Sequence, residues 1–287
     1  YEKESSYNYI QVLEKDGYRF LRLNEGQGIH SIYHPDYSAY WGTWMQVLPA
    51  PFFNDPPYTP ADVNNMAIIG LAAGTSARQA SGAFHALPID GYEIDQEIIL
   101  VGEDYFEMDL PNLTPIPEDG RWGLVHSGSK YSLISIDAYR PPYIPWHLTT
   151  QEFFQEVYQH LDDQGSLVLN VGRVPEEDKL LAGLVATIQT VFPSVYVIDV
   201  PGTLNSMIYA TAQPTSWENL EQNLVYLLQR DAPDKTLVQS IQVALENRRA
   251  LPEGGMIFTD DKAPIEQITN RMVLNSILTD PQLLGGE

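Results

Sequence analysis

The sequence contains no cysteine, few basic residues and no long hydrophobic run. The lack of cysteine excludes disulfide bonds and metal sites built on thiolates. Lysine and arginine number 16 against 38 aspartates and glutamates, which gives a formal net charge of −22. A surface of that sign repels phosphate backbones and anionic lipid, so we expect neither nucleic-acid binding nor membrane contact by this segment. No apolar stretch approaches the roughly 18 residues of a membrane span, and no signal peptide is visible.

The residues that are present are those of an ordinary soluble protein. Hydrophobic residues make up 44% of the 287 and charged residues 19%, which is typical of a chain that buries a sizeable core. This length predicts one large domain, or one domain with a small appendage. The acidic surface would attract cations, small organic ones included, although solubility alone is sufficient reason for the charge.

The chain divides by pattern into two regions, residues 1–60 and 61–287. In the first region apolar and polar residues alternate on both sides of Asp16 and Gly17, which predicts a β-hairpin, and residues 29–33 could add a third strand. Aromatic and apolar residues at helical spacing predict an amphipathic helix over 37–48. Prolines then mark a linker into the second region: Pro49, Pro51, Pro56, Pro57 and Pro60.

From residue 65 onward short apolar strands alternate with helical patterns, which predicts a parallel sheet covered by helices on both faces. The expected strands are 66–70, 86–94, 131–137 and 165–171. The expected helices between and after them are 75–84, 96–101, 149–161 and 178–191. Two further strands, 194–200 and 204–211, have no helix between them, so we expect an antiparallel last strand. Helices over 217–229, 235–246 and 264–278 follow.

A glycine-rich turn and an acidic residue after the next strand predict a nucleoside site. Gly70 and Gly74 lie between a strand and a helix, where glycines let the backbone and the helix N-terminus approach a ligand. Glu93 lies 23 residues after Gly70, at the end of the second strand, where an acid can accept hydrogen bonds from ribose hydroxyls. An exposed loop carboxylate is the alternative interpretation of Glu93.

Two further acidic elements follow in the sequence. Asp119 lies in the acidic segment EDGR at 118–121, and Asp137 ends the apolar strand 131–137. Either could belong to a solvated turn. Asp137 is the more informative one, because its strand delivers it to the crevice at the carboxyl edge of the sheet, where such folds bind ligands. A carboxylate there could act as a general base or hold a cationic group.

Taken in order, these segments resemble the spermidine synthase family. The resemblance is carried by GLAAGT (70–75), YEID (92–95), EDGR (118–121), YSLISIDAY (131–139), IPWHLTTQEFF (144–154) and FTDDKAPIE (258–266). It covers nearly the whole chain. It implies an α/β fold of the class I S-adenosylmethionine-dependent methyltransferase type, Rossmann-like, with a seven-stranded sheet and a small N-terminal β domain.

The resemblance also implies a transferase and a set of site residues. The co-substrate would be decarboxylated S-adenosylmethionine or S-adenosylmethionine, with no metal. Glu93 would hold the ribose hydroxyls, Asp119 the adenine amino group and Asp137 the reacting amine. The remaining expected residues are Gly70, Gly74 and Gly120 on the cofactor side, and His30, Tyr139 and Arg140 on the substrate side.

The resemblance further implies that the substrate is a polyamine or another small molecule and that the chain forms a homo-oligomer. The expected location is cytoplasmic. Some relatives place this domain after a membrane-spanning region, so the alternative expectation is a cytoplasmic domain of a membrane protein. That arrangement would fit a sequence that starts at Tyr1 and not at a methionine.

Two departures from the family pattern keep the reaction open. Members usually carry an aspartate inside the glycine-rich turn, which favours the decarboxylated cofactor. They also carry an aspartate at the end of the fourth strand, three residues after the position of Asp137. Here Ala73 and Arg140 occupy these places. A guanidinium repels a polyamine, or pairs with a substrate carboxylate or with Asp137 itself. A methyltransferase using intact S-adenosylmethionine and an adenosyl-binding domain without turnover are therefore the alternatives to aminopropyl transfer.

Three other features have two interpretations each. His147 could support the site or belong to a loop that caps a helix. Asp260 and Asp261 could bind a metal, but a helix-start cap before Pro264 is the commoner role. The aromatic residues of 37–44 could wall a substrate groove or pack a helix against the core.

Overall fold

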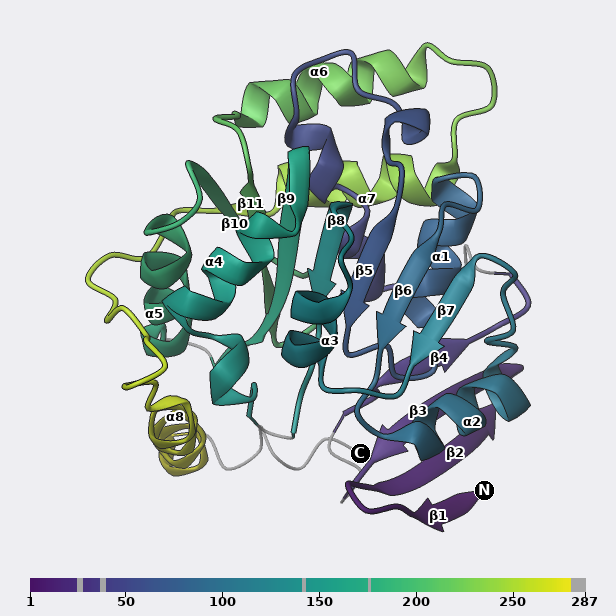
Figure 1. Cartoon of the computed structure of the whole chain (residues 1–287), viewed down its shortest axis with the longest axis vertical. Coiled ribbons are helices and arrows are strands. Elements are labelled where there is room, and N and C mark those ends of the chain that lie inside the picture. Colours follow the sequence, from purple (N-terminus) through teal and green to yellow (C-terminus); the bar gives the residue numbers. More distant parts are fainter. Residues whose placement is uncertain (25–27, 37–39, 141–142, 175–176, 280–287) are drawn as a thin grey trace.

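The structure is a computed structural model that describes residues 1–24, 28–36, 40–140, 143–174 and 177–279. It contains two β-sheets (Figure 1). A small antiparallel sheet is built from the N-terminal residues, and a large mixed sheet from the rest of the chain. No helix within these ranges is long and apolar enough to cross a membrane.

The small sheet has four strands in sequence order: β1 (Glu2–Glu4), β2 (Tyr9–Lys15), β3 (Tyr18–Leu23) and β4 (Ser31–Tyr33). Lys15 pairs with Tyr18, and the two residues between them, Asp16 and Gly17, both have positive φ angles. A two-residue turn of this kind matches the twist of a hairpin. The expected hairpin and third strand are confirmed, and β1 adds a short strand that the sequence pattern did not predict.

The large sheet has the strand order β12-β10-β11-β9-β8-β5-β6-β7. Its strands are β5 (Met66–Ile69), β6 (Ile89–Tyr92), β7 (Leu113–Ile116), β8 (Tyr131–Ile136), β9 (Leu161–Gly172), β10 (Ser194–Asp199), β11 (Asn205–Thr211) and β12 (Arg248–Arg249). Strands β5 to β9 pair in parallel, and β11 enters antiparallel between β9 and β10. The expected seven-stranded sheet with an antiparallel strand is confirmed, and the two-residue β12 adds an eighth strand at its edge.

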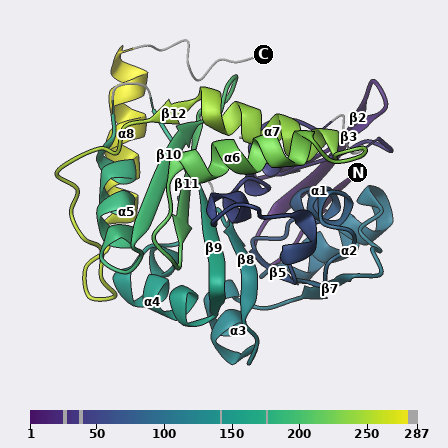
Figure 2. The same cartoon turned by 90° about the horizontal axis from the view of Figure 1, so that it is seen from above.

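Helices cover both faces of the large sheet, with α6 and α7 on one side and α3 and α4 on the other (Figure 2). The helices are α1 (Thr75–Ala83), α2 (Gln96–Phe106), α3 (Gly120–His126), α4 (Gln151–Gln159), α5 (Lys179–Gln189), α6 (Trp217–Leu228), α7 (Lys235–Glu246) and α8 (Ile265–Thr279). A separate apolar core lies on each face, because strands buried on both sides present apolar residues to both layers.

The amphipathic helix expected over 37–48 is wrong for the described part of that range. From residue 40 the structure has short 3₁₀ helices instead: η2 (Trp44–Val47), η3 (Ala50–Phe53) and η4 (Pro60–Asp62). Gly42 has a φ of 89°, and the following prolines remove helix donors, so a regular helix cannot continue. Phe52 and Phe53 are fully buried in the core beneath α6. The division at residue 60 stays a prediction, and the segment just before it packs into the large domain.

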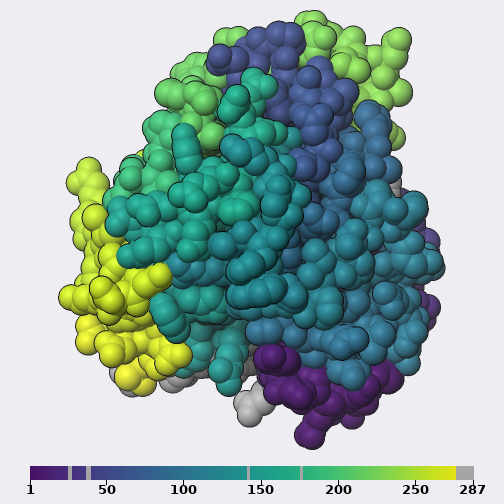
Figure 3. All heavy atoms as spheres, viewed as in Figure 1, coloured from purple at the N-terminus to yellow at the C-terminus, as the bar shows by residue number. Residues whose placement is uncertain are grey.

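The small sheet is attached to the carboxyl ends of β5, β6 and β7, below them in Figure 1. The Thr75 hydroxyl accepts a hydrogen bond from the Ile32 amide and donates one to its carbonyl, both at 2.9 Å. Ser31 accepts from the Ala73 amide at 2.9 Å. In Figure 3 the N-terminal strands (purple) and α8 (yellow) both lie at this lower end of the molecule. Residues far apart in the sequence therefore surround the carboxyl edge of the large sheet.

Candidate active site

The glycine-rich turn after β5 brings two strand ends into contact. Gly70 has a φ of 89°, and a Cβ atom built on it would lie 2.4 Å from the Asp137 carbonyl oxygen. Only glycine fits such a close approach in the left-handed region. Gly74 also has a positive φ, at 80°, and precedes the first residue of α1. The turn therefore sits directly beside the residue that follows β8.

Glu93 lies at the end of β6 and holds the turn with its carboxylate. The amide of Ala72 donates to Oε2 at 3.0 Å, and the amide of Asp95 donates to Oε1 at 3.1 Å. The side chain is buried, and burial raises the pKa of Glu93 to about 7 against the opposing effect of these hydrogen bonds. A buried carboxylate beside a glycine-rich turn can bind a diol, because charge-assisted hydrogen bonds are stronger than neutral ones.

Asp119 caps the N-terminus of α3 and contacts His147. Its Oδ1 accepts from the amides of Arg121 and Trp122, and its Oδ2 lies 2.9 Å from His147 Nε2. The hydrogen bond from His147 holds the pKa of Asp119 below its usual value. His147 therefore contacts Asp119, and a role of this pair in the site stays a prediction.

Arg121 joins this region to the C-terminal part of the chain. Its guanidinium forms paired hydrogen bonds with Glu156 of α4 and with Asp260, at 2.6 to 2.9 Å, and donates to the His147 carbonyl at 3.0 Å. Asp260 also accepts from Thr150 at 2.6 Å. Among the described residues no group of three or more histidines, aspartates or glutamates could hold a metal ion. The hydrogen bonds make Asp260 a partner of Arg121 and Thr150.

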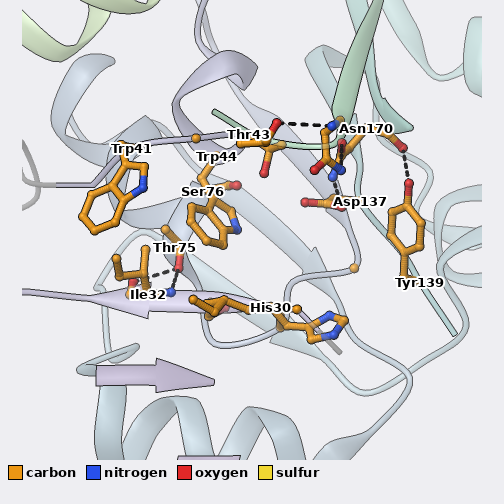
Figure 4. A pocket seen from close by; sticks show the side chains of 18 of the residues that line it. His30, Ile32, Trp41, Thr43, Trp44, Thr75, Ser76, Asp137, Tyr139 and Asn170 are labelled. Carbon is orange, nitrogen blue, oxygen red and sulfur yellow. Dashed lines mark hydrogen bonds between the residues drawn. The ribbon is translucent and has the colours of Figure 1, made fainter. Parts of the chain in front are cut away.

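Asp137 contacts Asn170 (Figure 4), which in turn contacts Asn205. Asn170 of β9 donates to Asp137 Oδ1 at 2.8 Å, and Asn205 of β11 donates to Asn170 Oδ1 at 3.0 Å. Burial raises the pKa of Asp137 to about 6, and the hydrogen bond from Asn170 opposes that rise. The carboxylate is thus fixed in direction while it keeps the basicity that a proton acceptor needs at neutral pH.

Two adjoining cavities open at this edge of the sheet. The first, which we call the nucleoside cavity, has a volume of about 560 Å³ and is lined by Tyr92, Glu93, Asp119, Gly120 and His147 among others. The second, the acceptor cavity, has about 550 Å³ and is lined by Trp41, Trp44, Ser76, Asn170 and Asn205 among others. Both are lined by His30, Gly70, Ala72, Asp137 and Tyr139. Asp137 therefore lies where the two cavities meet.

The structure brings most of the expected residues together. Glu93, Asp119, Gly120, Gly70 and Asp137 all line the nucleoside cavity, whereas Gly74 lines neither cavity and acts through the backbone conformation of the turn. Ala73 lines neither cavity either. It is buried in the apolar cluster that joins the small sheet to α2.

The three residues expected on the substrate side have different positions. His30 lines both cavities, and so does Tyr139, whose hydroxyl is engaged by the backbone of β9. It accepts from the Gly172 amide at 2.6 Å and donates to the Asn170 carbonyl at 3.1 Å. Arg140 is exposed and lines the nucleoside cavity, not the acceptor cavity. A substrate role for these three residues stays a prediction.

Sequence reasoning missed Asn170 and Asn205. Asn170 is the one polar residue within the apolar run at 167–171, and that interruption is the signal that could have pointed to it. Asn205 begins β11, and only the insertion of β11 beside β9 brings it next to Asn170.

Comparisons with known proteins bear on the fold and on the family that the chain resembles. No protein-family model matches the chain. A curated relative from Bifidobacterium longum, named a probable polyamine aminopropyl transferase, is 30% identical over 98% of this chain, which spans 64% of that relative's length. A probable spermidine synthase from Corynebacterium glutamicum superposes with a TM-score of 0.66 at 18% identity, covering 87% of this chain and 95% of the other.

A second solved structure, a spermidine synthase in complex with the transition-state analogue AdoDATO, has a TM-score of 0.64 at 18% identity and covers 88% of this chain and 84% of its own. At such identities the structural likeness establishes the fold, a class I methyltransferase-like sheet with an N-terminal β domain, and the curated relative matches along nearly the whole chain. The chain is similar along nearly its whole length to polyamine aminopropyltransferases, and it shares the fold of spermidine synthases.

Proposed function

We propose that this chain transfers an aminopropyl group from decarboxylated S-adenosylmethionine to a small amine. The observation that carries the proposal is the position of Asp137 between two cavities, one with carboxylates suited to a nucleoside and the other open to an acceptor. The name of the Bifidobacterium relative and the AdoDATO bound to a structural neighbour support the same reaction class.

The nucleoside cavity suits an adenosyl ligand. Glu93 would accept hydrogen bonds from the two ribose hydroxyls, and Asp119 would face the adenine amino group from the start of α3. Both carboxylates already accept backbone hydrogen bonds at 3.0 to 3.1 Å, so their orientation is set before a ligand enters. Preorganised groups of this kind lose little entropy on binding.

At the junction, Asp137 would bind the acceptor's ammonium group and take its proton. The free amine nitrogen then attacks the aminopropyl carbon attached to the sulfonium. A C–N bond forms, the C–S bond breaks with its electron pair going to sulfur, and methylthioadenosine leaves. Since Asn170 occupies Oδ1, we expect Oδ2 to face the amine. Holding both reactants in line supplies much of the rate enhancement, and the general base adds roughly 10²- to 10⁴-fold.

A methyltransferase that uses intact S-adenosylmethionine is the second candidate. Arg140 lines the nucleoside cavity and could pair with the carboxylate that the decarboxylated compound lacks.

Calorimetry with S-adenosylmethionine, its decarboxylated form and methylthioadenosine side by side separates the two candidates. Aminopropyl transfer requires tighter binding of the decarboxylated form than of the intact one. The reverse preference, weakened by Arg140→Gln, would support methyl transfer. Tight binding of all three without turnover of any amine would leave an adenosyl-binding domain as the function.

A further inference from the structure

The turn between β1 and β2 contributes to the nucleoside cavity. This turn, residues 5–8, which we call the N-terminal turn, connects Glu4 to Tyr9, and these two residues pair across the hairpin. Ser6, Tyr7 and Asn8 line the cavity together with Glu93, which follows a strand of the other sheet. The shape of the cavity therefore depends on how the N-terminal turn is held against the large sheet.

The carboxylate of Asp95 holds the N-terminal turn. Its Oδ2 accepts hydrogen bonds from the Ser5 hydroxyl at 2.5 Å and from the Asn8 side-chain amide at 2.9 Å. The Ser5 hydroxyl oxygen in turn accepts from the backbone amides of Tyr7 and Asn8, at 3.0 and 2.8 Å. Asp95 is only 2% exposed, and hydrogen bonds to an ionised acceptor are stronger than neutral ones. One buried carboxylate thus orders both ends of the turn.

The two oxygens of Asp95 have separate tasks. Oδ1 accepts from the Glu97 amide at 3.1 Å and caps α2, whereas Oδ2 accepts the two hydrogen bonds from the N-terminal turn. An N-cap needs one side-chain oxygen, which an asparagine supplies equally well. Capping alone therefore does not account for a residue with both carboxylate oxygens engaged.

We propose that Asp95 is a positioning residue that fixes the N-terminal turn as one wall of the nucleoside cavity. The proposal rests on the proposed adenosyl binding. Asp95 is not among the described residues that line the cavity, so it acts through the turn. The small sheet also packs on α2 through apolar residues such as Val12, Leu23 and Ile98 (Figure 1). Such packing is non-directional, so it holds the strands without orienting a polar turn.

Asp95→Asn separates the two tasks of this side chain. An asparagine keeps one oxygen for the Glu97 amide, but its NH₂ group cannot accept the hydrogen bonds from Ser5 and Asn8. Glu97→Gln is the matched control. It removes one negative charge from the first turn of the same helix, together with the ion pair between Glu97 and Lys3 of β1, and leaves the contacts of Asp95 in place.

Amide hydrogen exchange tests the order of the turn without any ligand. We expect the amides of Tyr7 and Asn8 to exchange about tenfold faster in D95N than in the wild type and E97Q, because the turn loses two hydrogen bonds. The amides at the start of α2 should keep their wild-type exchange, since the cap is retained. Unchanged exchange at Tyr7 and Asn8, or faster exchange at α2 alone, overturns the proposal.

Calorimetry with methylthioadenosine tests the consequence for the cavity. Burial is the main cause of the raised pKa of Glu93, and the charge of Asp95 adds to it, so binding is measured at about pH 8.5, where Glu93 is ionised in every variant except E93Q. We expect about tenfold weaker binding in D95N and wild-type affinity in E97Q. Wild-type affinity in D95N overturns the proposal.

Ser5→Ala removes the same link from the other side. We expect S5A to weaken methylthioadenosine binding as D95N does, and the double variant to bind no more weakly than D95N alone, because both changes break one contact. Effects that multiply in the double variant overturn the proposal. A wild type that binds no methylthioadenosine contradicts the proposed function instead, and the exchange comparison alone then decides whether Asp95 positions the turn.

Discussion

Three carboxylates at the proposed site differ in pKa because their surroundings differ. Burial raises the pKa of Glu93 to about 7 and that of Asp137 to about 6, whereas the hydrogen bond from His147 lowers the pKa of Asp119. The two buried groups hold protons in the folded state that the unfolded chain releases. Their contribution to stability therefore declines as pH rises, from 4.5 toward about 7 for Glu93 and from 3.8 toward about 6 for Asp137.

Replacing Glu93 should remove most of the affinity for the nucleoside. Glu93→Gln leaves an amide where we expect two charge-assisted hydrogen bonds to ribose, each contributing about 1.5–3 kcal/mol. We expect methylthioadenosine to bind at least about tenfold more weakly by calorimetry, with the melting temperature checked beside it. Glu97→Gln is the matched control, because Glu97 pairs with Lys3 outside both cavities. Unchanged affinity in a folded E93Q protein removes Glu93 from the site.

The raised pKa of Glu93 also predicts a pH dependence of nucleoside binding. Below about pH 7 the free protein holds Glu93 protonated, and the neutral acid is a poorer acceptor for ribose hydroxyls. The affinity for methylthioadenosine should rise by at most about tenfold per pH unit as pH increases toward 7. Above pH 7 the affinity should level off. Calorimetry between pH 6 and 8 measures this. A flat wild-type profile, or one that persists in E93Q, would assign the dependence to another group.

Among the secondary-structure elements, the turn between β5 and α1 contributes Gly70 and Ala72 to the lining of both cavities. Gly70→Ala should destabilise the fold for two reasons, a φ of 89° and a Cβ 2.4 Å from the Asp137 carbonyl oxygen. Gly254→Ala is the control, because Gly254 has a φ of 75° with no atom within 4 Å of an added Cβ. The strain of a positive φ is common to both, about 1 kcal/mol. Denaturant unfolding should show a clearly larger loss for G70A, and equal losses would contradict the close approach.

Asp119 both caps the N-terminus of α3 and lines the nucleoside cavity, so its replacement should affect stability and binding together. Asp119→Ala removes the cap of α3, which costs about 1 kcal/mol, and one proposed contact to adenine. Asp234→Ala removes the cap of α7, away from both cavities. We expect a loss of stability in both variants, at least as large in D119A because this variant also loses the hydrogen bond with His147. Methylthioadenosine binding should weaken only in D119A, by less than in E93Q. An equal affinity in D119A and D234A would show that Asp119 does not contact adenine.

Elements with strong local patterns could be predicted from the sequence, and those that depend on distant partners could not. The helices α6 and α7 were expected within one residue of their observed ends, because regular apolar spacing and an N-cap residue define each one locally. The helix expected over 37–48 was wrong for the described residues because Gly42 has a φ of 89° and the chain forms only the short 3₁₀ helix η2 after it. Trp41 and Trp44 line the acceptor cavity, and Val47 and Leu48 contact the core. Strand β12 has only two residues and forms by pairing with β10, so no local pattern marks it.

At the scale of the whole molecule, the nucleoside half of the site was predictable and the acceptor half was not. Glu93 and Asp137 each follow a strand that the sequence pattern predicts, so their common edge follows from the fold, whereas Asp119 follows β7, which the pattern did not predict, and was expected only from the family resemblance. The acceptor cavity is assembled from residues 28–32, 41–44, 170 and 203–205, which meet only through the docking of the small sheet and the insertion of β11. A net charge of −22 favours the approach of cationic substrates to both cavities. The expected homo-oligomer and cellular location stay predictions.

Release of methylthioadenosine is the direct readout of aminopropyl transfer with Asp137 as the proton acceptor. The full chain is incubated with decarboxylated S-adenosylmethionine and an excess of n-butylamine or putrescine, and methylthioadenosine and the aminopropylated amine are quantified together. We expect equal amounts of the two products from the wild type, and a rate lower by about 10²-fold or more in Asp137→Asn with methylthioadenosine affinity retained. No product from the wild type with either amine, or an undiminished rate in D137N, would contradict the account.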